Sequence, residues 1–335
     1  MALHIKLYEN IVVDTIAEDS SFLEATEDLF FKIQSGHMGR FLYYDTQNDK
    51  YKGIVSWNDC VANGMTTMDK VIFQYSLSQL SELLGKNQNI VEFGPGSMKD
   101  AEYLLSVFGS VLYVAIDINP SIEDIGKKLV KEKFPNCKFE FRNLDFFKES
   151  RLVTNTPAIG VMLGLTIGNV PGPITSEYKE RLTFALSRLS SFLPDNSYMI
   201  ITIDTCQEGH TNIKYYKPML ENMVLGIFHR MNIDLPMTNF DPDAFKYEPV
   251  WISESSLVAH IVTATKNQRF KLGEKEVCIF KDESFHIQNS YRFESAVFEV
   301  CARDAGLSVE RYWQQPPDTA RLYLLKKKLE HGYIC

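Results

Sequence analysis

The chain has 335 residues, of which 45% are hydrophobic and 23% charged, and its formal net charge is −8 at pH 7. This length allows a substantial core and predicts two domains, or one domain with a large elaboration. The acidic balance argues against a broad nucleic-acid footprint, which needs clustered Lys and Arg, and no apolar run approaches the ~20 residues of a membrane helix.

Six cysteines are spread along the chain, and no pair has the spacing of a Cys-x-x-Cys motif. Together with the lack of a His and Cys cluster, this predicts no zinc or other metal site. The N-terminus shows no charged start followed by an apolar core, so we expect no secretory signal. These features predict a cytoplasmic protein with reduced thiols that binds neither nucleic acid nor membrane.

The first third of the chain leads to a strand, a tight turn and a helix. Apolar spacing predicts a helix over 68–85, and the apolar run 90–93 then enters a turn that contains Gly94 and Gly96. Ser97 is the predicted N-cap of the helix that follows. The two glycines let the backbone turn sharply and leave room for a ligand against the end of the strand.

The next predicted strand, 111–118, carries Asp117 near its end, 23 residues after Gly94. An acidic residue about 20 residues beyond such a turn reaches a ribose hydroxyl. The third glycine of a dinucleotide fingerprint would fall at Lys99, which disfavours a bound pyrophosphate. This combination favours S-adenosylmethionine as the cofactor, although the turn by itself is equally typical of an ordinary strand-helix connection.

Strands continue to alternate with helices as far as Asp204, which predicts a doubly wound parallel sheet of the Rossmann-like α/β class. Asp145 follows the third strand, either at the edge where such sheets bind ligands or as a simple turn residue. The predicted elements are a helix at 121–133, a strand at 138–142, a strand at 158–165, a helix at 178–193 and a strand at 197–204.

The alternation of predicted strands and helices ends after Asp204. Residues 205–240 are predicted to be helical, antiparallel strands follow within 250–290, and a helix and hairpin at 293–325 return to the sheet. We therefore expect residues 66–204 to form the cofactor-binding domain and residues 291–335 to complete its sheet. Residues 205–290 are expected to form a second, α+β lobe; the family resemblance described below implies that residues 1–65 join this lobe and that it holds the substrate. His260 and His286, in strands of this lobe, are interpreted as structural histidines.

These residues give the chain a resemblance to the histidine-specific, S-adenosylmethionine-dependent methyltransferases, whose relatives include fungal enzymes that methylate a tryptophan-derived precursor. The resemblance covers about residues 40–327 and implies a class I methyltransferase fold and an N-methylation reaction. The segments that carry it are Tyr44-Asp45, Glu92-Phe-Gly-Pro-Gly96, the strand from Tyr113 to Asp117, Asp145-Phe146, Gly164-Leu-Thr-Ile-Gly-Asn169 and Gln288-Asn-Ser290.

The resemblance implies a cofactor side and a substrate side, with positioning rather than a general base as the source of catalysis. The predicted cofactor-binding residues are Glu92, Gly94, Gly96, Asp117, Asp145 and Phe146. The predicted substrate-binding residues are Tyr44, Asn169, Tyr215 or Tyr216, Gln288 and Ser290. Asn169 would hold the amino-acid backbone of the substrate, a tyrosine its carboxylate, and Ser290 would lie in the side-chain pocket.

Three departures from the family pattern bear on the substrate. Gln288 stands where the family has a glutamate, Ala259 where it has a methionine, and the segment 57–62 replaces a Pro-Glu-Tyr-Tyr motif. Glutamine cannot supply the negative charge of a glutamate. We predict an N-methyltransferase for an amino acid, or a small molecule derived from one, other than free histidine. The alternatives are a methyltransferase for another small-molecule or peptide nitrogen, and a cofactor-binding protein without transfer activity.

Overall fold

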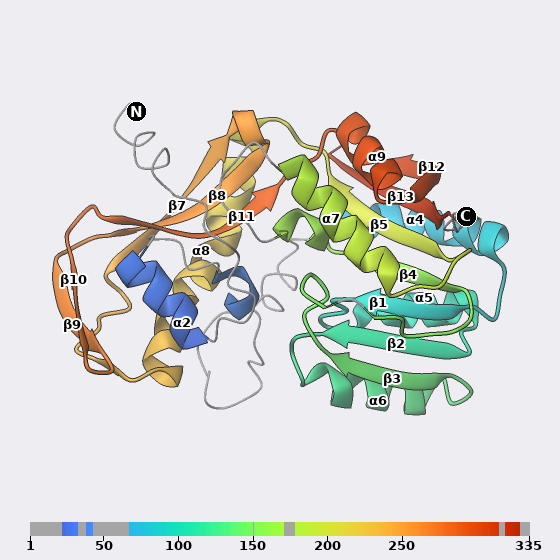
Figure 1. The fold of residues 1–335 in the computed structure, drawn as a ribbon, viewed down its shortest axis with the longest axis horizontal. Helices are drawn as coiled ribbons and strands as arrows, with labels where there is room; N and C mark the ends of the chain where they lie inside the picture. Colours follow the sequence, from blue (N-terminus) through green and yellow to red (C-terminus); the bar gives the residue numbers. More distant parts are fainter. Residues whose placement is uncertain are drawn as a thin grey trace, which may run out of the picture. The chain divides into compact units, whose positions relative to one another are not determined.

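A computed structural model describes residues 22–32, 38–42, 67–149, 151–170, 178–314 and 319–328 of the chain (Figure 1). The chain divides into two compact units. The large-sheet unit takes its described residues from 67–170, 178–206 and 292–328, and the small-sheet unit takes them from 22–42 and 207–291. Within the described residues, no helix combines the length and the apolar character needed to cross a membrane.

The large-sheet unit is built on seven strands in the order β12-β13-β5-β4-β1-β2-β3. The five strands from β5 to β3 run parallel, and β13 and β12 add an antiparallel hairpin beside β5. This confirms the predicted Rossmann-like sheet. The strands are β1 (Asn89–Phe93), β2 (Leu112–Asp117), β3 (Lys138–Asn143), β4 (Ala158–Met162), β5 (Tyr198–Asp204), β12 (Leu307–Gln314) and β13 (Ala320–Lys327).

Helices cover both faces of this sheet (Figure 1). On one face, Ile90 of β1 packs in a buried cluster with side chains of α4 and α5. On the other, the ring of Phe93 lies 5.5 Å from Phe192, which follows α7. Alternate β1 residues therefore face opposite helix layers, as a parallel sheet buried on both sides requires. The helices are α4 (Thr67–Leu84), α5 (Lys99–Phe108), α6 (Ile122–Lys133), α7 (Tyr178–Ser191) and α9 (Ser295–Asp304), with a 3-10 turn η4 (Thr166–Asn169).

The small-sheet unit contains two three-stranded sheets, in the orders β11-β8-β7 and β10-β9-β6. Its strands are β6 (Met237–Thr238), β7 (Phe245–Ile252), β8 (Leu257–Ala264), β9 (Gln268–Leu272), β10 (Lys275–Ile279) and β11 (Ser284–Tyr291). Its helical segments are α2 (Phe22–Glu27), η1 (Asp28–Lys32), η2 (Met38–Leu42), α8 (Gly209–Asp234) and η5 (Ser253–Ser255).

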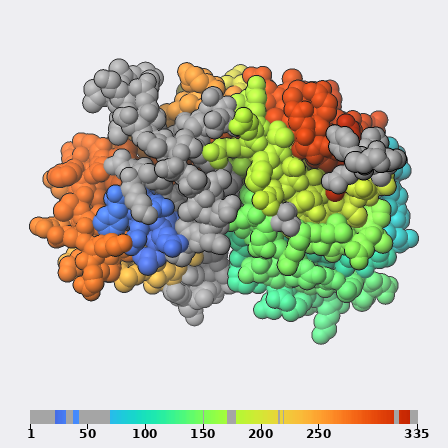
Figure 2. Space-filling view, in the orientation of Figure 1, coloured from blue at the N-terminus to red at the C-terminus, as the bar shows by residue number. Residues whose placement is uncertain are grey.

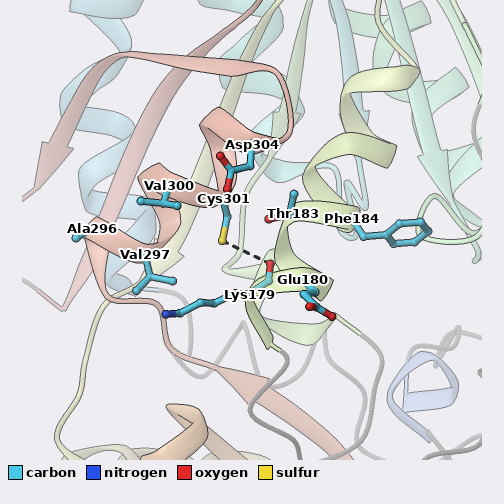
Figure 3. Close-up of a pocket in the computed structure, with 9 residues that line it drawn as sticks. All are labelled: Lys179, Glu180, Thr183, Phe184, Ala296, Val297, Val300, Cys301 and Asp304. Atoms are coloured by element: carbon cyan, nitrogen blue, oxygen red, sulfur yellow. Dashed lines mark hydrogen bonds between the residues drawn. The ribbon is translucent and has the colours of Figure 1, made fainter.

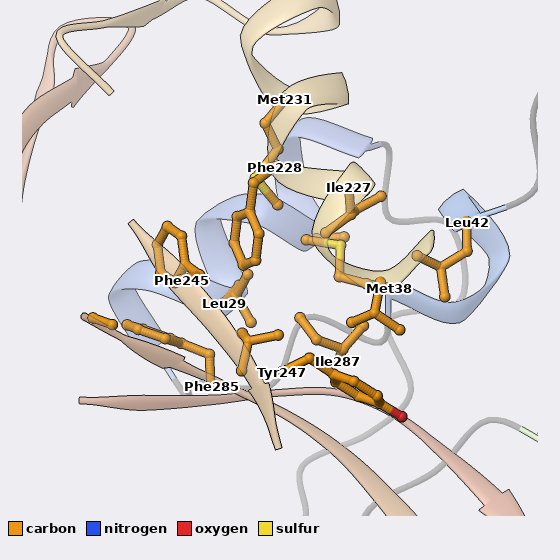
Figure 4. Close-up of a cluster of buried hydrophobic side chains, with 14 of the residues drawn as sticks. Leu29, Met38, Leu42, Ile227, Phe228, Met231, Phe245, Tyr247, Phe285 and Ile287 are labelled. Carbon is orange, nitrogen blue, oxygen red and sulfur yellow. The ribbon is translucent and has the colours of Figure 1, made fainter. Parts of the chain in front are cut away.

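The long helix α8 supplies one side of the core of the small-sheet unit (Figure 4). The rings of Phe228 on α8 and Phe245 on β7 stack with centroids 4.0 Å apart and planes 4° apart. Leu29, Met38 and Ile287 add side chains from η1, η2 and β11 to the same cluster. Residues far apart in the sequence thus share one apolar core, which fixes the register of β7, β8 and β11 against α8.

Candidate active site

The predicted cofactor residues lie at one edge of the large sheet, at the carboxyl ends of its parallel strands. Gly94 follows β1, Asp117 ends β2, Asp145 follows β3, and Asn169 ends the turn η4 that follows β4. The order β4-β1-β2-β3 makes these four strands consecutive neighbours. Open α/β sheets bind their ligands outside this edge, so the structure brings these residues together where a ligand site is expected.

The glycine turn after β1 has the backbone that its sequence predicts. Gly94 and Gly96 have φ values of +70° and +52°, which glycine adopts at little cost. The N–H of Gly94 donates a hydrogen bond of 2.8 Å to the carbonyl of Ile116 on β2, which ties the turn to the neighbouring strand. A Cβ placed on Gly96 would meet no heavy atom within 4 Å. The turn therefore leaves open space beside Gly96 that a ligand can fill.

One detail of this turn differs from the prediction. The residue before α5 is Met98, in the left-handed region with φ 59°, and no side chain caps the helix by a hydrogen bond. The assignment of Ser97 as N-cap was wrong because the chain makes one more tight turn, closed by a 3.0 Å hydrogen bond from the Met98 N–H to the Pro95 carbonyl. The helix α5 ends at Gly109, which has φ 57° and whose backbone N–H donates a hydrogen bond to the Leu105 carbonyl.

Asp117 is held as a fixed acceptor at the end of β2. Its side chain is buried, and Oδ1 accepts a 2.8 Å hydrogen bond from the backbone N–H of Asn119. Burial raises the pKa of this carboxyl group, whereas backbone hydrogen bonds from Asn119, Gly96 and Ile118 oppose the rise. The bond from Gly96 links the acid to the glycine turn. A carboxylate has about four lone-pair positions, so these bonds leave it able to accept from a ligand diol.

Glu92 lies beneath the glycine turn in a dry environment. Tyr113 on β2 donates a 2.7 Å hydrogen bond to its Oε2 atom, and only 3% of the residue is exposed. Burial is the main cause that raises the pKa of Glu92 from 4.5 to about 8; the bond from Tyr113 lowers this pKa, and the nearby Asp100 and Asp117 carboxyls contribute to the rise. Glu92 therefore carries a proton at neutral pH in the folded chain and links β1 to β2.

Phe146 gives the edge an aromatic surface beside the glycine turn. Its ring stands edge-on to Phe93 at 5.8 Å and to Phe147 at 4.8 Å. A Cβ on Gly94 would lie 3.8 Å from this ring. The preceding residue, Asp145, accepts a 3.0 Å hydrogen bond from the backbone N–H of Phe147 at Oδ1 and is half-buried. An aromatic face next to a fixed carboxylate suits a nucleoside, whose base stacks and whose ribose donates hydrogen bonds.

Asn169 closes a tight turn that follows β4. Gly164 and Leu165 both have positive φ, 69° and 58°, so the chain reverses sharply before the 3-10 turn. The Leu165 N–H donates to Thr202 Oγ1 on β5 at 3.3 Å, and the Thr166 hydroxyl donates to the Leu163 carbonyl at 2.8 Å. The turn is thus fixed to the sheet, and it presents a half-buried Asn169 at the carboxyl edge.

Three predicted substrate residues of the small-sheet unit converge on His260. The Ser290 hydroxyl lies 2.9 Å from His260 Nε2, and the Tyr216 ring on α8 stands edge-on to the imidazole at 5.6 Å. Gln288 on β11 is the direct cross-strand partner of His260 on β8, so both side chains project from the same face of the sheet. The structure therefore groups these residues around a histidine that the sequence marked only as structural.

A second polar contact fixes His260 from the opposite side. The Tyr247 hydroxyl on β7 lies 2.6 Å from His260 Nδ1, and the two rings are parallel to within 7°. His260 is fully buried, and Tyr247 is 1% exposed. The sequence analysis missed this contact because it placed no strand at residues 245–252. The alternation of the apolar Phe245 and Tyr247 with the charged Lys246 and Glu248 was the available signal, since it has the period of two that marks a strand.

Gln288 packs against the backbone of the 3-10 turn η2. A Cβ placed on Gly39 would lie 2.3 Å from Gln288 Oε1, so only glycine fits there without displacing the amide. The other histidine of this strand pair, His286, lies 2.7 Å from Asn289 Oδ1 through Nε2 and is buried. The structure does not describe three parts of the chain that the sequence analysis discussed. These are Tyr44, the Tyr215 side chain and the segment 57–62.

A separate groove of about 660 Å³ lies between α7 and α9 in the large-sheet unit (Figure 3). The two helices lie side by side on the visible face of this unit (Figure 2). Inside the groove, Cys301 Sγ contacts the Lys179 carbonyl at 3.5 Å. The lining residues include no residue predicted for the cofactor or the substrate.

Among the described residues, no group of three or more His, Cys, Asp or Glu side chains is arranged to hold a metal ion.

The sheet order and the glycine turn define a class I methyltransferase fold. Residues 44–327 match the family described as histidine-specific, SAM-dependent methyltransferases. This match covers most of the chain, so the chain belongs to that family and is a methyltransferase that uses S-adenosylmethionine. The recognition of the family and of the cofactor from the sequence is thereby confirmed.

Two relatives are similar to this chain over most of its length. An uncharacterized protein of Sinorhizobium fredii, y4iF, is 28% identical over 231 residues, which are 66% of this chain and 75% of that protein. The 4-dimethylallyltryptophan N-methyltransferase easF of Trichophyton verrucosum is 21% identical over 314 residues, 85% of this chain and 87% of the enzyme. Among solved structures, the sugar N-methyltransferase KedS8 from Streptoalloteichus sp. is 10% identical with a TM-score of 0.47, over 83% of this chain and 95% of that one.

The residues at the carboxyl edge fit this cofactor. The open space beside Gly96, the fixed carboxylate of Asp117 and the aromatic ring of Phe146 supply a backbone approach, an acceptor for a diol and an apolar surface. These are the three features that an adenosine group requires. The fit depends on glycines and strand ends, so it follows from the fold of the large-sheet unit.

Proposed function

We propose that this chain transfers the methyl group of S-adenosylmethionine to the amino nitrogen of an amino acid, or of a small molecule built from one. The observation that carries the proposal is the position of Asn169, one strand from the glycine turn at the same edge of the sheet. The family and the named activity of the easF relative support an amino-acid-derived amine.

We assign Asp117, Asp145, Phe146 and the glycine turn to the cofactor. Asp117 would bind the ribose hydroxyls, Phe146 would border the adenine, and the turn would let the ligand approach the backbone at Gly96. Glu92 would support these residues from within the sheet, because its carboxyl group accepts a hydrogen bond from Tyr113 and so links β1 to β2 next to the glycine turn. When bound, S-adenosylmethionine would supply a methyl group on a positively charged sulfur, so that an amine lone pair can attack the methyl carbon while the carbon–sulfur bond breaks and S-adenosylhomocysteine leaves.

The chain then has to position an amine rather than activate it. An asparagine amide can donate to a carboxylate and accept from an amine, so we assign Asn169 to the amino-acid backbone of the substrate. Its turn is fixed to β5 through Thr202, which limits the freedom of the side chain. Proximity and orientation of this kind supply on the order of 7–11 kcal/mol in favourable cases, so the proposal names no general base.

We assign the polar group of the small-sheet unit to the rest of the substrate. Ser290 and Gln288 offer neutral hydrogen-bonding groups, and Tyr216 offers a phenol next to His260. Gln288 can donate and accept but carries no charge. These groups suit a neutral polar or aromatic side chain better than the imidazole that the family's glutamate would hold.

The deciding experiment is a screen of amino acids and amino-acid derivatives with methyl-labelled S-adenosylmethionine, with mass spectrometry to locate the new methyl group. We expect transfer to the α-nitrogen of at least one of these compounds and loss of transfer in Asn169→Ala. Transfer to oxygen, to carbon or to no compound, in protein that still binds S-adenosylhomocysteine, would refute the proposal.

A further inference from the structure

Asp100 is a partly buried acid at the start of α5, and one of its oxygens has no donor to bond with. Within the described part of the chain, the Oδ1 atom of Asp100 is buried and has no hydrogen-bond partner. Burial raises the pKa of this carboxyl group. Buried acceptors are nearly always paired, because an unpaired one costs free energy. The residue as a whole is only partly buried, so a ligand can reach the carboxyl group from its open side.

The surroundings of Asp100 belong to the glycine turn. Helix α5 begins at Lys99, directly after the turn that contains Gly94 and Gly96. The Asp100 carboxyl group is close enough to Glu92, in the strand before this turn, to contribute to the raised pKa of that buried acid. The space beside Gly96 is open, since a Cβ placed there would meet no heavy atom within 4 Å. A ligand that fills this space therefore lies next to the start of α5.

Positive charges also surround Asp100. Lys70 on α4 and Lys99 on α5 lower the pKa of Asp100 through their charges, without a hydrogen bond to it. The N-terminus of α5 adds a partial positive charge, and no side chain caps it by a hydrogen bond. A carboxylate beside two ammonium groups and a helix N-terminus is complementary to a zwitterion, which presents an ammonium group and a carboxylate together.

S-adenosylmethionine carries such a zwitterion at its amino-acid end. The assignments above put its adenosine against Asp117 and Phe146, after β2 and β3, and the methyl acceptor against Asn169, after β4. Because β1 lies between β4 and β2, the sulfur and its methyl group then lie beside the end of β1. The amino-acid end branches from the same sulfur, so it is left with the turn after β1 and the start of α5.

We propose that Asp100 binds the α-ammonium group of S-adenosylmethionine, with Lys70 and Lys99 on the side of the α-carboxylate. An ammonium group has three donors and no acceptor, so it supplies the partner that the carboxylate of Asp100 lacks. Hydrogen bonds between charged groups are the strong ones, and they offset the cost of burying Asp100. The inference uses the adenosine assignment made above, but it does not depend on which molecule receives the methyl group.

The test uses four ligands that differ only in the amino-acid end, with affinities measured by calorimetry. S-adenosylhomocysteine has both charged groups, its deamino analogue lacks the ammonium, its decarboxy analogue lacks the carboxylate, and methylthioadenosine lacks both. Wild-type protein should bind S-adenosylhomocysteine about ten-fold more tightly than the deamino analogue. Asp100→Asn should weaken S-adenosylhomocysteine about ten-fold and change the affinity for the deamino analogue by less than about two-fold.

Two comparisons separate recognition of the ammonium group from a structural role, since an acid in the first turn also stabilises a helix. Asp100→Asn should leave the affinity for methylthioadenosine unchanged, whereas general damage to the turn would weaken every ligand. The matched control is Glu102→Gln on the same helix, because Glu102 pairs with Lys133 at 2.6 Å on the exposed surface. The control should leave all affinities unchanged. Equal weakening of S-adenosylhomocysteine and its deamino analogue in Asp100→Asn, or no weakening of either, would overturn the inference.

The lysines should give the opposite pattern. Replacing Lys70 and Lys99 together by methionine should weaken S-adenosylhomocysteine and the deamino analogue, which both keep the carboxylate. The same protein should bind the decarboxy analogue as well as wild type does or more tightly, because two positive charges near its ammonium group are removed. Equal weakening of the decarboxy analogue would contradict the placement of the carboxylate beside these lysines.

Failure of this inference is distinguishable from failure of the assignments made above. If Asp117→Ala leaves the affinity for methylthioadenosine unchanged, the adenosine assignment is wrong, and the comparison of S-adenosylhomocysteine with its deamino analogue still decides the role of Asp100. If no amino-acid-derived amine is methylated, the proposed function fails. The binding measurements are unaffected by that outcome, because they need no methyl acceptor.

Discussion

The buried carboxyl of Glu92 makes a specific prediction for the stability of the protein. In Glu92→Gln, an amide of the same shape replaces a group that bears a proton in the folded chain at neutral pH. Tyr113 can still donate its hydrogen bond, because the glutamine retains an oxygen at the position of Oε2. The variant therefore removes the ionisation of residue 92 while it preserves the link between β1 and β2.

The size and sign of the effect follow from the raised pKa. Burial moves the pKa of Glu92 from 4.5 to about 8. An acid with a raised pKa stabilises the folded state fully below its unfolded pKa and loses that contribution as the pH rises through the folded pKa. One pKa unit corresponds to about 1.36 kcal/mol, so the difference of about 3.5 gives a loss on the order of 5 kcal/mol between pH 4.5 and 8. Glu92→Gln should escape this loss.

The assay is urea unfolding of cofactor-free protein at several pH values between 5 and 8. The free energy of unfolding of Glu92→Gln minus that of wild type should increase steadily with pH, because shared contributions from other groups cancel in the difference. Glu82→Gln, at an exposed position on α4, is the control and should give a flat difference. A flat difference for Glu92→Gln as well would refute the reasoning, since it would mean that Glu92 is ionised in the folded protein at the same pH as in the unfolded chain.

Four further substitutions test the proposed cofactor-binding and substrate-binding residues. Asp117→Ala should weaken binding of S-adenosylhomocysteine by roughly 1.5–3 kcal/mol, the range for hydrogen bonds to charged groups; unchanged affinity by calorimetry would contradict its assignment. Asn169→Ala should lower turnover with nearly intact cofactor affinity, whereas equal loss of both would indicate a purely structural turn. Gly39→Ala should displace the Gln288 amide and raise the substrate KM several-fold, and an unchanged KM would exclude Gln288 from the site. Gln288→Glu should move the preference towards histidine, and efficient methylation of histidine by wild-type protein would argue against this reasoning.

The positions of the proposed cofactor residues in the fold were predictable from the sequence because their geometry is local. A glycine at a positive φ, a polar residue at the end of an apolar strand and a helix that follows are all visible in a short window. Gly94, Gly96 and Asp117 therefore fell at the carboxyl edge as expected. The error at Ser97 has the same local origin, since a serine before a helix is a typical cap and nothing in the sequence signals that Met98 takes the left-handed position.

The contacts of His260 with Tyr247 and Ser290 were not predictable in the same way. These two residues lie 13 and 30 residues from His260 and meet it only through the registers of β7 and β11 with β8. The sequence analysis also placed no strand over β7, whose Pro249 lacks the backbone donor that a central strand needs. β7 is in fact the outer strand of its sheet, where a proline is tolerated.

The proposed cofactor residues and the proposed substrate residues therefore differ in how easily evolution or design can change them. The cofactor side depends on backbone conformation at Gly94 and Gly96, where any other residue would be strained. The proposed substrate residues act through side chains, with Gln288 packed on Gly39 and Ser290 in contact with His260. Under the proposed function, a change at Gln288 would alter which substrate groups can be hydrogen-bonded and would leave the glycine turn untouched. Substrate preference should thus vary among chains that keep the same cofactor residues, and Gln288 together with Ser290 is where such variation should be sought first.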